Sequence, residues 1–474
     1  MRQSLRRSCW KCAKSKLACD LATPRCSRCA KTGARCVYAN EPLTAKSSPT
    51  TSGGPSTLTI YSPASMDPFD SYPSTRLPRH HVQRLIHSFL NKIAFQYYPL
   101  DLNKTSNPFL VSWWPLALGD PALFHVTLQT ACLDEELIAQ QGFTTSELLM
   151  SDSVALLRRK VQDSALAIQD GTMNSVITLA TIEFGKGNKM LAEMHVEGVK
   201  KLVSLRGGIG AVRQTSPLTA RMISWVSLLI MGSPQFQTQD DVGIGDGIPP
   251  SPEWLKINSA VYYDGLPQLL DCDAVDPAVL NVFARLRMIL RQAQQMPLSS
   301  TRLHDLTSFV IHRLLLSAPD TEDSSTSPTS ESLRYAITLF MFLVQGPTYY
   351  SHAVIFIENV RRLTLHLNRI DSTPRAHGFL SVWLYGVGMA AAAGTTYYER
   401  LVERAGNVSG LLHVADGDEA MAHVKNVLWL ATPHADGIYR RHWDAALSMG
   451  GGSQASTPLP PRGALLGDDL GEAS

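Results

Sequence analysis

Six cysteines near the N-terminus have the spacing of a metal site. They follow the pattern Cys9-x2-Cys12-x6-Cys19-x6-Cys26-x2-Cys29-x6-Cys36, in which the motif C-x2-C-x6-C occurs twice. Zinc prefers four thiolates in a tetrahedron, and a C-x2-C pair turns back so that two sulfurs reach one ion. Six sulfurs are too few for two separate tetrahedra, but two shared sulfurs make up the difference. The pattern therefore predicts two zinc ions in one binuclear cluster.

Three other chemistries use paired cysteines: a disulfide-linked knot, a redox-active C-x2-C site, and zinc ribbons that contact proteins. The segment Met1–Arg7 has no apolar stretch like that of a secretory signal. We therefore expect a reducing compartment, which favours metal binding over disulfides. The basic character of the segment favours DNA over a protein as the partner.

Charge is unevenly distributed along the chain. Residues 1–40 contain ten Lys or Arg and one acidic residue, whereas the remainder contains 33 basic and 40 acidic residues. A small basic module on an acidic body is typical of a protein with one polyanion-binding end. Because about 40 residues bury too little surface to fold alone, we expect this module to need metal for folding.

Residues 6–38 resemble the fungal zinc binuclear cluster family, Zn2Cys6. Pro24, two residues before the fourth cysteine, and Tyr38, shortly after the sixth, also match the family pattern. The resemblance implies that Cys9 and Cys26, the first and fourth cysteines, bridge the two ions. It also implies a short helix after each C-x2-C pair, the first of which enters the major groove of DNA.

The resemblance assigns base reading to Lys16, which occupies the position of the family's base-contacting lysine. An ammonium group donates to O6 and N7 of guanine, which predicts a CGG-type half-site. Ala13, Ser15 and Ala18 stand where the family often has basic residues, a departure that bears on DNA affinity more than on zinc binding. The side chains expected to contact phosphates, or to keep the module soluble, are Arg6, Arg7, Lys11, Lys14, Arg25, Arg28, Lys31 and Arg35.

Composition divides the chain into four zones. We predict a DNA-binding domain over residues 1–40, a disordered Ser/Thr/Pro-rich linker over 41–76, a regulatory body over 77–447 and a disordered tail over 448–474. The six prolines of the linker exclude the coiled coil that many relatives carry after the cluster. We therefore expect the cluster to bind DNA as a monomer, or as a homodimer joined through the helical body.

Apolar residues recur at helical spacing throughout the body, which predicts a mostly α fold: a small zinc cluster and a large all-helical domain. Helices are expected over residues 81–98, 123–139, 154–168, 190–205, 217–231, 277–295, 302–317, 332–345, 351–368 and 378–404, with a loop over 318–331. Residues 378–398 carry no charge, as in a membrane span, but glycines and threonines dilute them, and we expect a buried core helix.

The body resembles the helical regulatory region of fungal transcription factors, most clearly over residues 85–235. The segments that carry the resemblance include Asn107–Phe109, Trp113–Ala117, Asp120–His125 and His195–Gly208. Trp113, Trp114 and Phe124 are expected in the core or an interface. The resemblance implies that the body controls activation through intramolecular contacts, dimerisation or an effector, and a plain helical scaffold is equally open.

No enzymatic activity is predicted. The glycine-rich segments Gly207–Gly210 and Gly243–Gly247 do not lie between a strand and a helix, and the chain has no H-E-x-x-H or G-x-S-x-G motif. His80, His81, His195 and His442 are expected to be surface or core residues rather than metal ligands.

These observations predict a nuclear, sequence-specific regulator of RNA polymerase II transcription. Its partners would be double-stranded DNA and the transcription machinery or co-regulators, with no membrane. The run Cys12–Lys16 resembles that of secondary-metabolite regulators of the aflatoxin type, and the acidic and leucine-rich Leu465–Leu470 resembles an activation segment. Two alternatives remain: a zinc-dependent protein-interaction or corepressor factor with little base specificity, and a helical enzyme or ligand receptor tethered to DNA.

Overall fold

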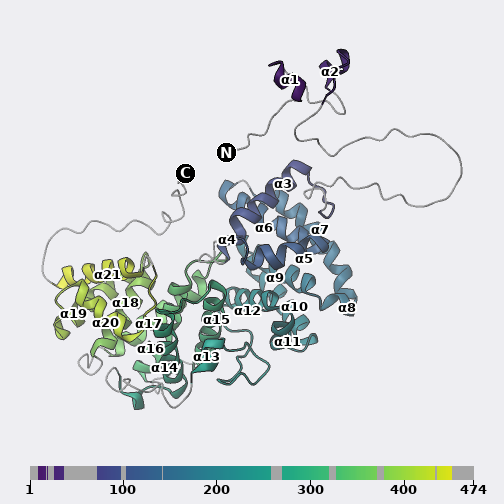
Figure 1. Ribbon diagram of the computed structural model, residues 1–474. Helices are drawn as coiled ribbons and strands as arrows, with labels where there is room; N and C mark the ends of the chain where they lie inside the picture. Colours follow the sequence, from purple (N-terminus) through teal and green to yellow (C-terminus); the bar gives the residue numbers. More distant parts are fainter. Residues whose placement is uncertain are drawn as a thin grey trace. The chain divides into compact units, whose positions relative to one another are not determined.

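The computed structural model divides into two compact units, residues 1–74 and 75–474 (Figure 1). It describes residues 9–17, 19, 26–36, 72–97, 103–140, 142–257, 270–319, 327–370, 378–432 and 435–450. The predicted linker, apart from residues 72–76, and the predicted tail after residue 450 lie outside the described residues, as does the expected activation segment.

Both units are built from helices. The first contains α1 (Trp10–Lys14) and α2 (Ser27–Lys31). The second contains α3 (Arg79–Ser88), η1 (Phe89–Ile93), α4 (Ala94–Gln96), η2 (Phe109–Trp113), α5 (Trp114–Gly119), α6 (Pro121–Ala139), α7 (Thr144–Gln162), α8 (Ser164–Ala167), α9 (Asp170–Gly185), α10 (Lys189–Leu205), α11 (Ile209–Thr215), α12 (Pro217–Met231), α13 (Pro252–Lys256), η3 (Cys272–Ala274), α14 (Pro277–Ala293), α15 (Ser300–Leu316), α16 (Pro328–Gln345), α17 (Ala353–Ile370), α18 (Gly378–Ala392), α19 (Tyr398–Leu412), α20 (Gly417–Val427) and α21 (Ala435–Gly450). Among the described residues, the β pairing is a single isolated bridge between Thr238 and Ile248. The predicted all-helical fold is thus confirmed.

Several predicted helices match the structure to within about two residues at each end, α6, α10, α12 and α14 among them. One predicted segment is wrong in its bounds: the helix expected over 154–168 begins ten residues earlier, as α7, and is interrupted at Asp163. The Asp163 carboxylate accepts hydrogen bonds from the backbone N–H groups of Ala165 and Leu166. It therefore caps a new helix, α8, instead of continuing the old one.

Two other predicted boundaries also need correction. The loop expected over 318–331 ends at Ser327, because the Ser327 hydroxyl caps α16 and Pro328 occupies its first turn, where the missing proline N–H costs nothing. The single helix expected over 378–404 is two helices, α18 and α19, separated by residues 393–397. Gly394 adopts a left-handed φ of 78° in that break, which ends α18.

The segment Asp120–His125, which carries part of the family resemblance, starts the central helix α6. The Asp120 carboxylate accepts hydrogen bonds from the backbone N–H of Ala122 and Leu123 and forms an ion pair with Lys160. A Cβ added to Gly171 of α9 would lie 1.8 Å from Asp120 Oδ2, so the carboxylate that caps α6 leaves room only for glycine at position 171. These residues therefore fix how α6, α7 and α9 pack.

The tryptophans expected in the core are structural. Trp113 is buried, and its indole Nε1 donates to Thr127 Oγ1 of α6 at 2.9 Å. Phe124 is also buried, whereas Trp114 is half-buried with its ring centroid 6.1 Å from that of Phe124. The prediction of core positions is confirmed for Trp113 and Phe124.

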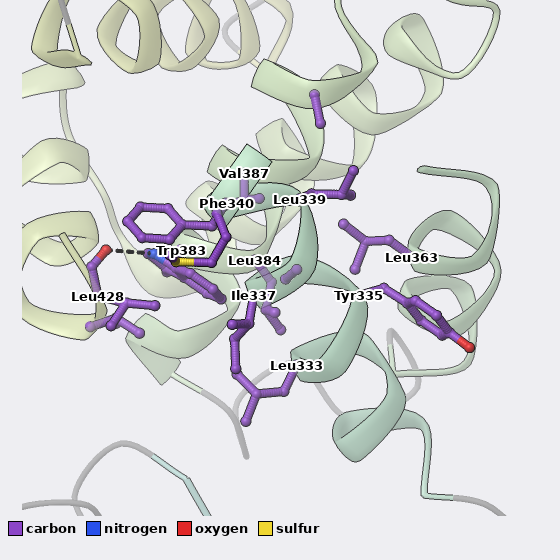
Figure 2. Close-up of a cluster of buried hydrophobic side chains, with 14 of the residues drawn as sticks. Leu333, Tyr335, Ile337, Leu339, Phe340, Leu363, Trp383, Leu384, Val387 and Leu428 are labelled. Carbon is purple, nitrogen blue, oxygen red and sulfur yellow. Dashed lines mark hydrogen bonds between the residues drawn. The ribbon is translucent and has the colours of Figure 1, made fainter. Parts of the chain in front are cut away.

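A second core lies around α16 and α18 (Figure 2). Leu333, Ile337 and Phe340 of α16 pack in one cluster with Trp383 and Val387 of α18. The Trp383 indole donates to the Leu428 backbone carbonyl at 2.8 Å, so its polar atom is satisfied inside the core. Residues 380–392 of α18 are all buried, which confirms the predicted core helix. Within the described residues, no helix has the length and apolarity needed to cross a membrane.

Candidate metal centre and nucleic-acid interface

The helices α1 and α2 place the cysteines of the two motif copies in equivalent positions. Cys9 precedes α1 and Cys12 lies within it, while Cys26 is the N-cap of α2 and Cys29 lies within that helix. All four are buried, and Cys19 and Cys36 are half-buried. Each short helix therefore turns its C-x2-C pair inward, so that these sulfurs form the buried cluster of the described part of this unit.

The sulfur separations fit zinc. Four sulfurs placed tetrahedrally at about 2.3 Å from an ion lie about 3.8 Å from one another. The Sγ atoms of Cys9 and Cys26 are 3.8 Å apart, and those of Cys9 and Cys29, and of Cys12 and Cys26, are 3.7 Å apart. A disulfide needs about 2.05 Å, so these sulfurs are spaced for coordination and not for oxidation. None of the eight cysteines, all of which are described, is in a disulfide.

The sulfurs form two overlapping groups of four. Cys9, Cys12, Cys19 and Cys26 make up the first group, and Cys9, Cys26, Cys29 and Cys36 make up the second. Within each group, all sulfurs lie within 4.8 Å of one another. Cys9 and Cys26 occur in both groups, which is the placement that bridging ligands require. In the described part of the chain, no other cluster of His, Cys, Asp or Glu reaches this closeness.

Backbone N–H groups point at the sulfurs in the same way in both halves. Cys12 N donates to Cys9 Sγ and Cys29 N donates to Cys26 Sγ, each at 3.4 Å. Across each half, Cys9 N donates to Cys19 Sγ at 3.5 Å and Cys26 N donates to Cys36 Sγ at 3.4 Å. Such bonds, together with the N-termini of the helices, stabilise negative charge on the sulfurs and hold them in place.

Crowding makes the thiols hard to ionise without a cation. Burial, followed by the neighbouring sulfurs of Cys9 and Cys26, raises the pKa of the Cys12 thiol to about 12. Burial and the same kind of neighbours also raise the pKa of Cys29. Zinc supplies the positive charge that turns such thiols into thiolates, and its binding therefore releases protons.

The basic side chains that the structure describes in this module are exposed to solvent. Lys11, Lys14, Lys16, Arg28 and Lys31 are all exposed, as is Arg35. Arg6, Arg7 and Arg25, which we also expect to contact DNA, lie outside the described residues. The structure thus places the described cations where a polyanion can reach them.

Lys16 occupies the position that Gly33 has in the other half, and both residues have a left-handed backbone. It has a left-handed φ of 51° just after α1, and Leu17 N donates back to the Cys12 carbonyl at 3.0 Å. In the second half, Gly33 has a φ of 61°, and Ala34 N donates to the Cys29 carbonyl at 3.1 Å. Both helices therefore end in the same left-handed cap, which usually takes glycine. At Lys16 a side chain occupies this position at a cost of about 1 kcal/mol. Sequence reasoning missed this conformation, although the alignment of the two motif copies contains the signal.

The histidines of the body do not form a metal site in the described residues. His442 is buried, and its Nδ1 lies 2.9 Å from the Tyr398 hydroxyl. His195 is half-buried, and burial lowers its pKa. His80 is exposed and belongs to the first turn of α3. The glycines over 243–247 lie in a loop whose Gly247 packs against the Gln237 backbone, not ahead of a helix that binds phosphate.

Comparison with known proteins finds two domains. Residues 7–45 match the family model of the fungal Zn(2)-Cys(6) binuclear cluster domain. Residues 84–239 match that of the fungal specific transcription factor domain. No curated protein and no solved structure matches the chain. The first match, with the sulfur geometry, confirms the prediction of two zinc ions per chain. Both domains are those of transcription factors rather than enzymes.

Proposed function

We propose that this chain, which carries both domains of a fungal Zn2Cys6 transcription factor, recognises CGG-type half-sites in double-stranded DNA through the first half of its zinc cluster. The observation that carries the proposal is the position of Lys16. This lysine occupies a strained left-handed cap beside the sulfur core, where its counterpart is Gly33. A long cationic side chain at a position that glycine fills without strain is explained by a contact that only the side chain makes.

In this proposal the six cysteines are the zinc ligands. Cys9 and Cys26 bridge the two ions, since they alone belong to both sulfur groups. The ions supply the cross-links that hold α1 and α2 together. The chain itself supplies the N–H···S bonds that orient the sulfurs and the cations that face outward.

The cations divide by task. Lys16 donates to guanine O6 and N7 in the major groove. The phosphate contacts come from Lys11, Lys14, Arg28 and Lys31 and, on sequence grounds, from Arg6, Arg7 and Arg25. Phosphate contacts set affinity and its salt dependence without adding sequence preference.

The domains then have separate roles. Residues 1–40 bind DNA, and residues 41–76 link them to the helical regulatory body predicted over 77–447, which α21 extends to Gly450; the residues after 450 form a tail. The protein acts in the nucleus on RNA polymerase II transcription, with the transcription machinery or co-regulators as partners. Control of a secondary-metabolite gene cluster is the biological role that the Cys12–Lys16 run favours. Two copies associate through the helical body.

The test measures zinc content and DNA binding on the full chain. We expect two zinc ions per chain and a clear preference for a CGG duplex over a scrambled duplex of the same length at fixed salt. Two zinc ions with equal affinity for both duplexes would refute base reading and favour a zinc-dependent interaction or corepressor factor. One zinc ion, or none, would refute the binuclear cluster itself.

A further inference from the structure

One helix of the body has an apolar row on the side that faces away from the fold. The buried face of α10, which includes Ala192, Val196 and Val199, lies against the body, mainly against α9 (Figure 1). The opposite face carries Met190, Met194, Glu197, Lys201 and Leu205, at the spacing of one helix face. We call these five residues the α10 outer row.

The apolar members of the row are unusually open to solvent. Met190 is 77% exposed, Leu205 is 72% exposed and Met194 is 57% exposed. Single exposed apolar residues are normal on protein surfaces, but here Met190 and Met194 lie one turn apart and Leu205 lies on the same helix face near its other end. The row has one acid and one base at its centre, which restrict the partners that it fits.

We propose that the α10 outer row is a self-association surface, on which a second copy of this chain docks its own α10 in antiparallel orientation about a two-fold axis. When the axis crosses α10 at the level of residue 199, Glu197 lies level with the partner's Lys201. In the same register, Met194 lies within one residue of the level of the partner's Leu205. The two-fold axis repeats both contacts, so the row is complementary to itself.

The ends of the helix fit the same register. Met190 lies level with the partner's Gly208, in a turn where Gly207 and Gly208 have left-handed φ values of 99° and 93°. Neither glycine carries a side chain that would fill the space level with the methionine. One register therefore satisfies the charged centre, the flanking apolar pair and both ends of the row.

The charges also exclude the other symmetric arrangement. A parallel pair would place each residue beside its own copy, with Glu197 against glutamate and Lys201 against lysine. Within the described part of the chain, Lys201 has no ion-pair partner, so its ammonium is available. Glu197 accepts a hydrogen bond from Lys200 Nζ at 2.8 Å and is still half exposed.

This inference deepens the proposed function, because it names the surface through which two copies join. It is tested by sedimentation of the zinc-loaded full chain over a wide concentration range. We expect a reversible dimer. Lys201→Glu and Glu197→Lys each place like charges at both central pairs and should raise the dimer dissociation constant at least about tenfold. The double variant E197K/K201E restores the pairs and should return the constant close to that of the wild type.

The control is Lys189→Glu, which makes the same charge change on α10 but off the outer row, and it should leave the dimer intact. All these side chains are exposed, so thermal unfolding should change little in any variant. A chain that is monomeric throughout, or a dimer insensitive to both single reversals, would overturn the inference. Binding of the same variants to a duplex with one CGG half-site should stay at the wild-type level. If the wild-type chain shows no preference for CGG, base reading is refuted, but the conclusion about the dimer is unaffected.

Discussion

Replacing Lys16 by glycine separates the two properties that this position combines. The backbone there has a φ of 51°, which glycine adopts without strain and lysine adopts at a cost of about 1 kcal/mol. We therefore expect Lys16→Gly to make the zinc-bound module more stable by about 1 kcal/mol. Because folding of so small a module is coupled to zinc, the gain should appear as slower or weaker removal of zinc by a competing chelator.

The same change should remove base reading. A lysine contact to guanine contributes about 1–3 kcal/mol of discrimination, which corresponds to about 5- to 150-fold in affinity. Fluorescence anisotropy with the full chain would compare a CGG duplex with a scrambled duplex at fixed salt. We expect the preference for CGG to fall by that factor, while affinity for the scrambled duplex falls only slightly.

Two matched variants complete the experiment. Lys16→Ala also removes the ammonium but keeps the strain, so it should lose the CGG preference without gaining stability. Gly33→Ala introduces the same strain in the other half, where a Cβ meets no atom within 4 Å, and should weaken zinc retention while keeping the preference. An equal loss of affinity on both duplexes in Lys16→Gly would show that Lys16 contacts only phosphate. An unchanged preference would refute any role in DNA reading.

Three further predictions follow from other parts of the chain. Cys9→Ser should disturb both ions whereas Cys36→Ser should disturb one, as measured by zinc content per chain; a Cys9→Ser chain with one ion held at wild-type affinity would contradict bridging. Burial lowers the pKa of His312 to about 4, so the folded body excludes a proton that the unfolded chain takes up below pH 6.5. The contribution of His312 to the stability of the body is therefore complete above pH 6.5, and it falls by up to about 3 kcal/mol as the pH drops to 4. Tryptophan-monitored thermal unfolding should show this fall, and His312→Leu should make it shallower; an unchanged slope would refute the assignment. Gly171→Ala should displace the carboxylate that caps α6 and lower the free energy of unfolding by about 1–2 kcal/mol. Gly119→Ala, which meets no atom within 4 Å, should be close to neutral in the same denaturant titration.

The metal centre was more predictable from sequence than any other part of the chain. Cysteine spacing limits which sulfurs can meet at one ion, and two copies of one spacing give equivalent geometry in both halves. The left-handed conformation of Lys16 was not predicted, because lysine normally avoids it and the signal lies in the comparison with Gly33. The zinc ligands can thus be predicted from local cysteine spacing, whereas the left-handed backbone of Lys16 can be predicted only by comparing the two halves.

Those helices of the body that have one solvent-exposed face could be predicted from the sequence. The helix over 190–205 was predicted because its apolar residues recur at helical spacing along one face. The neighbouring α9 was missed, because Gly171 to Glu183 are all buried and leave no helical period to detect. Its threonines, valine and isoleucines also have low helix propensity, so tertiary packing decides its structure. The helices α20 and α21 were missed as well, and α21 extends to Gly450, into the predicted tail.

The repeated motif within the cluster also separates the positions that hold metal from the positions that can differ between the two halves. A single C-x2-C-x6-C unit offers three sulfurs, one fewer than a zinc tetrahedron needs. Neither half therefore supplies four sulfurs alone, and each group of four sulfurs draws on both halves. The positions between the cysteines are not under that constraint, and the two halves differ at equivalent helix caps, where one has Lys16 and the other Gly33. A scaffold constrained at six positions can thus differ at a seventh in one half without any change to its zinc ligands.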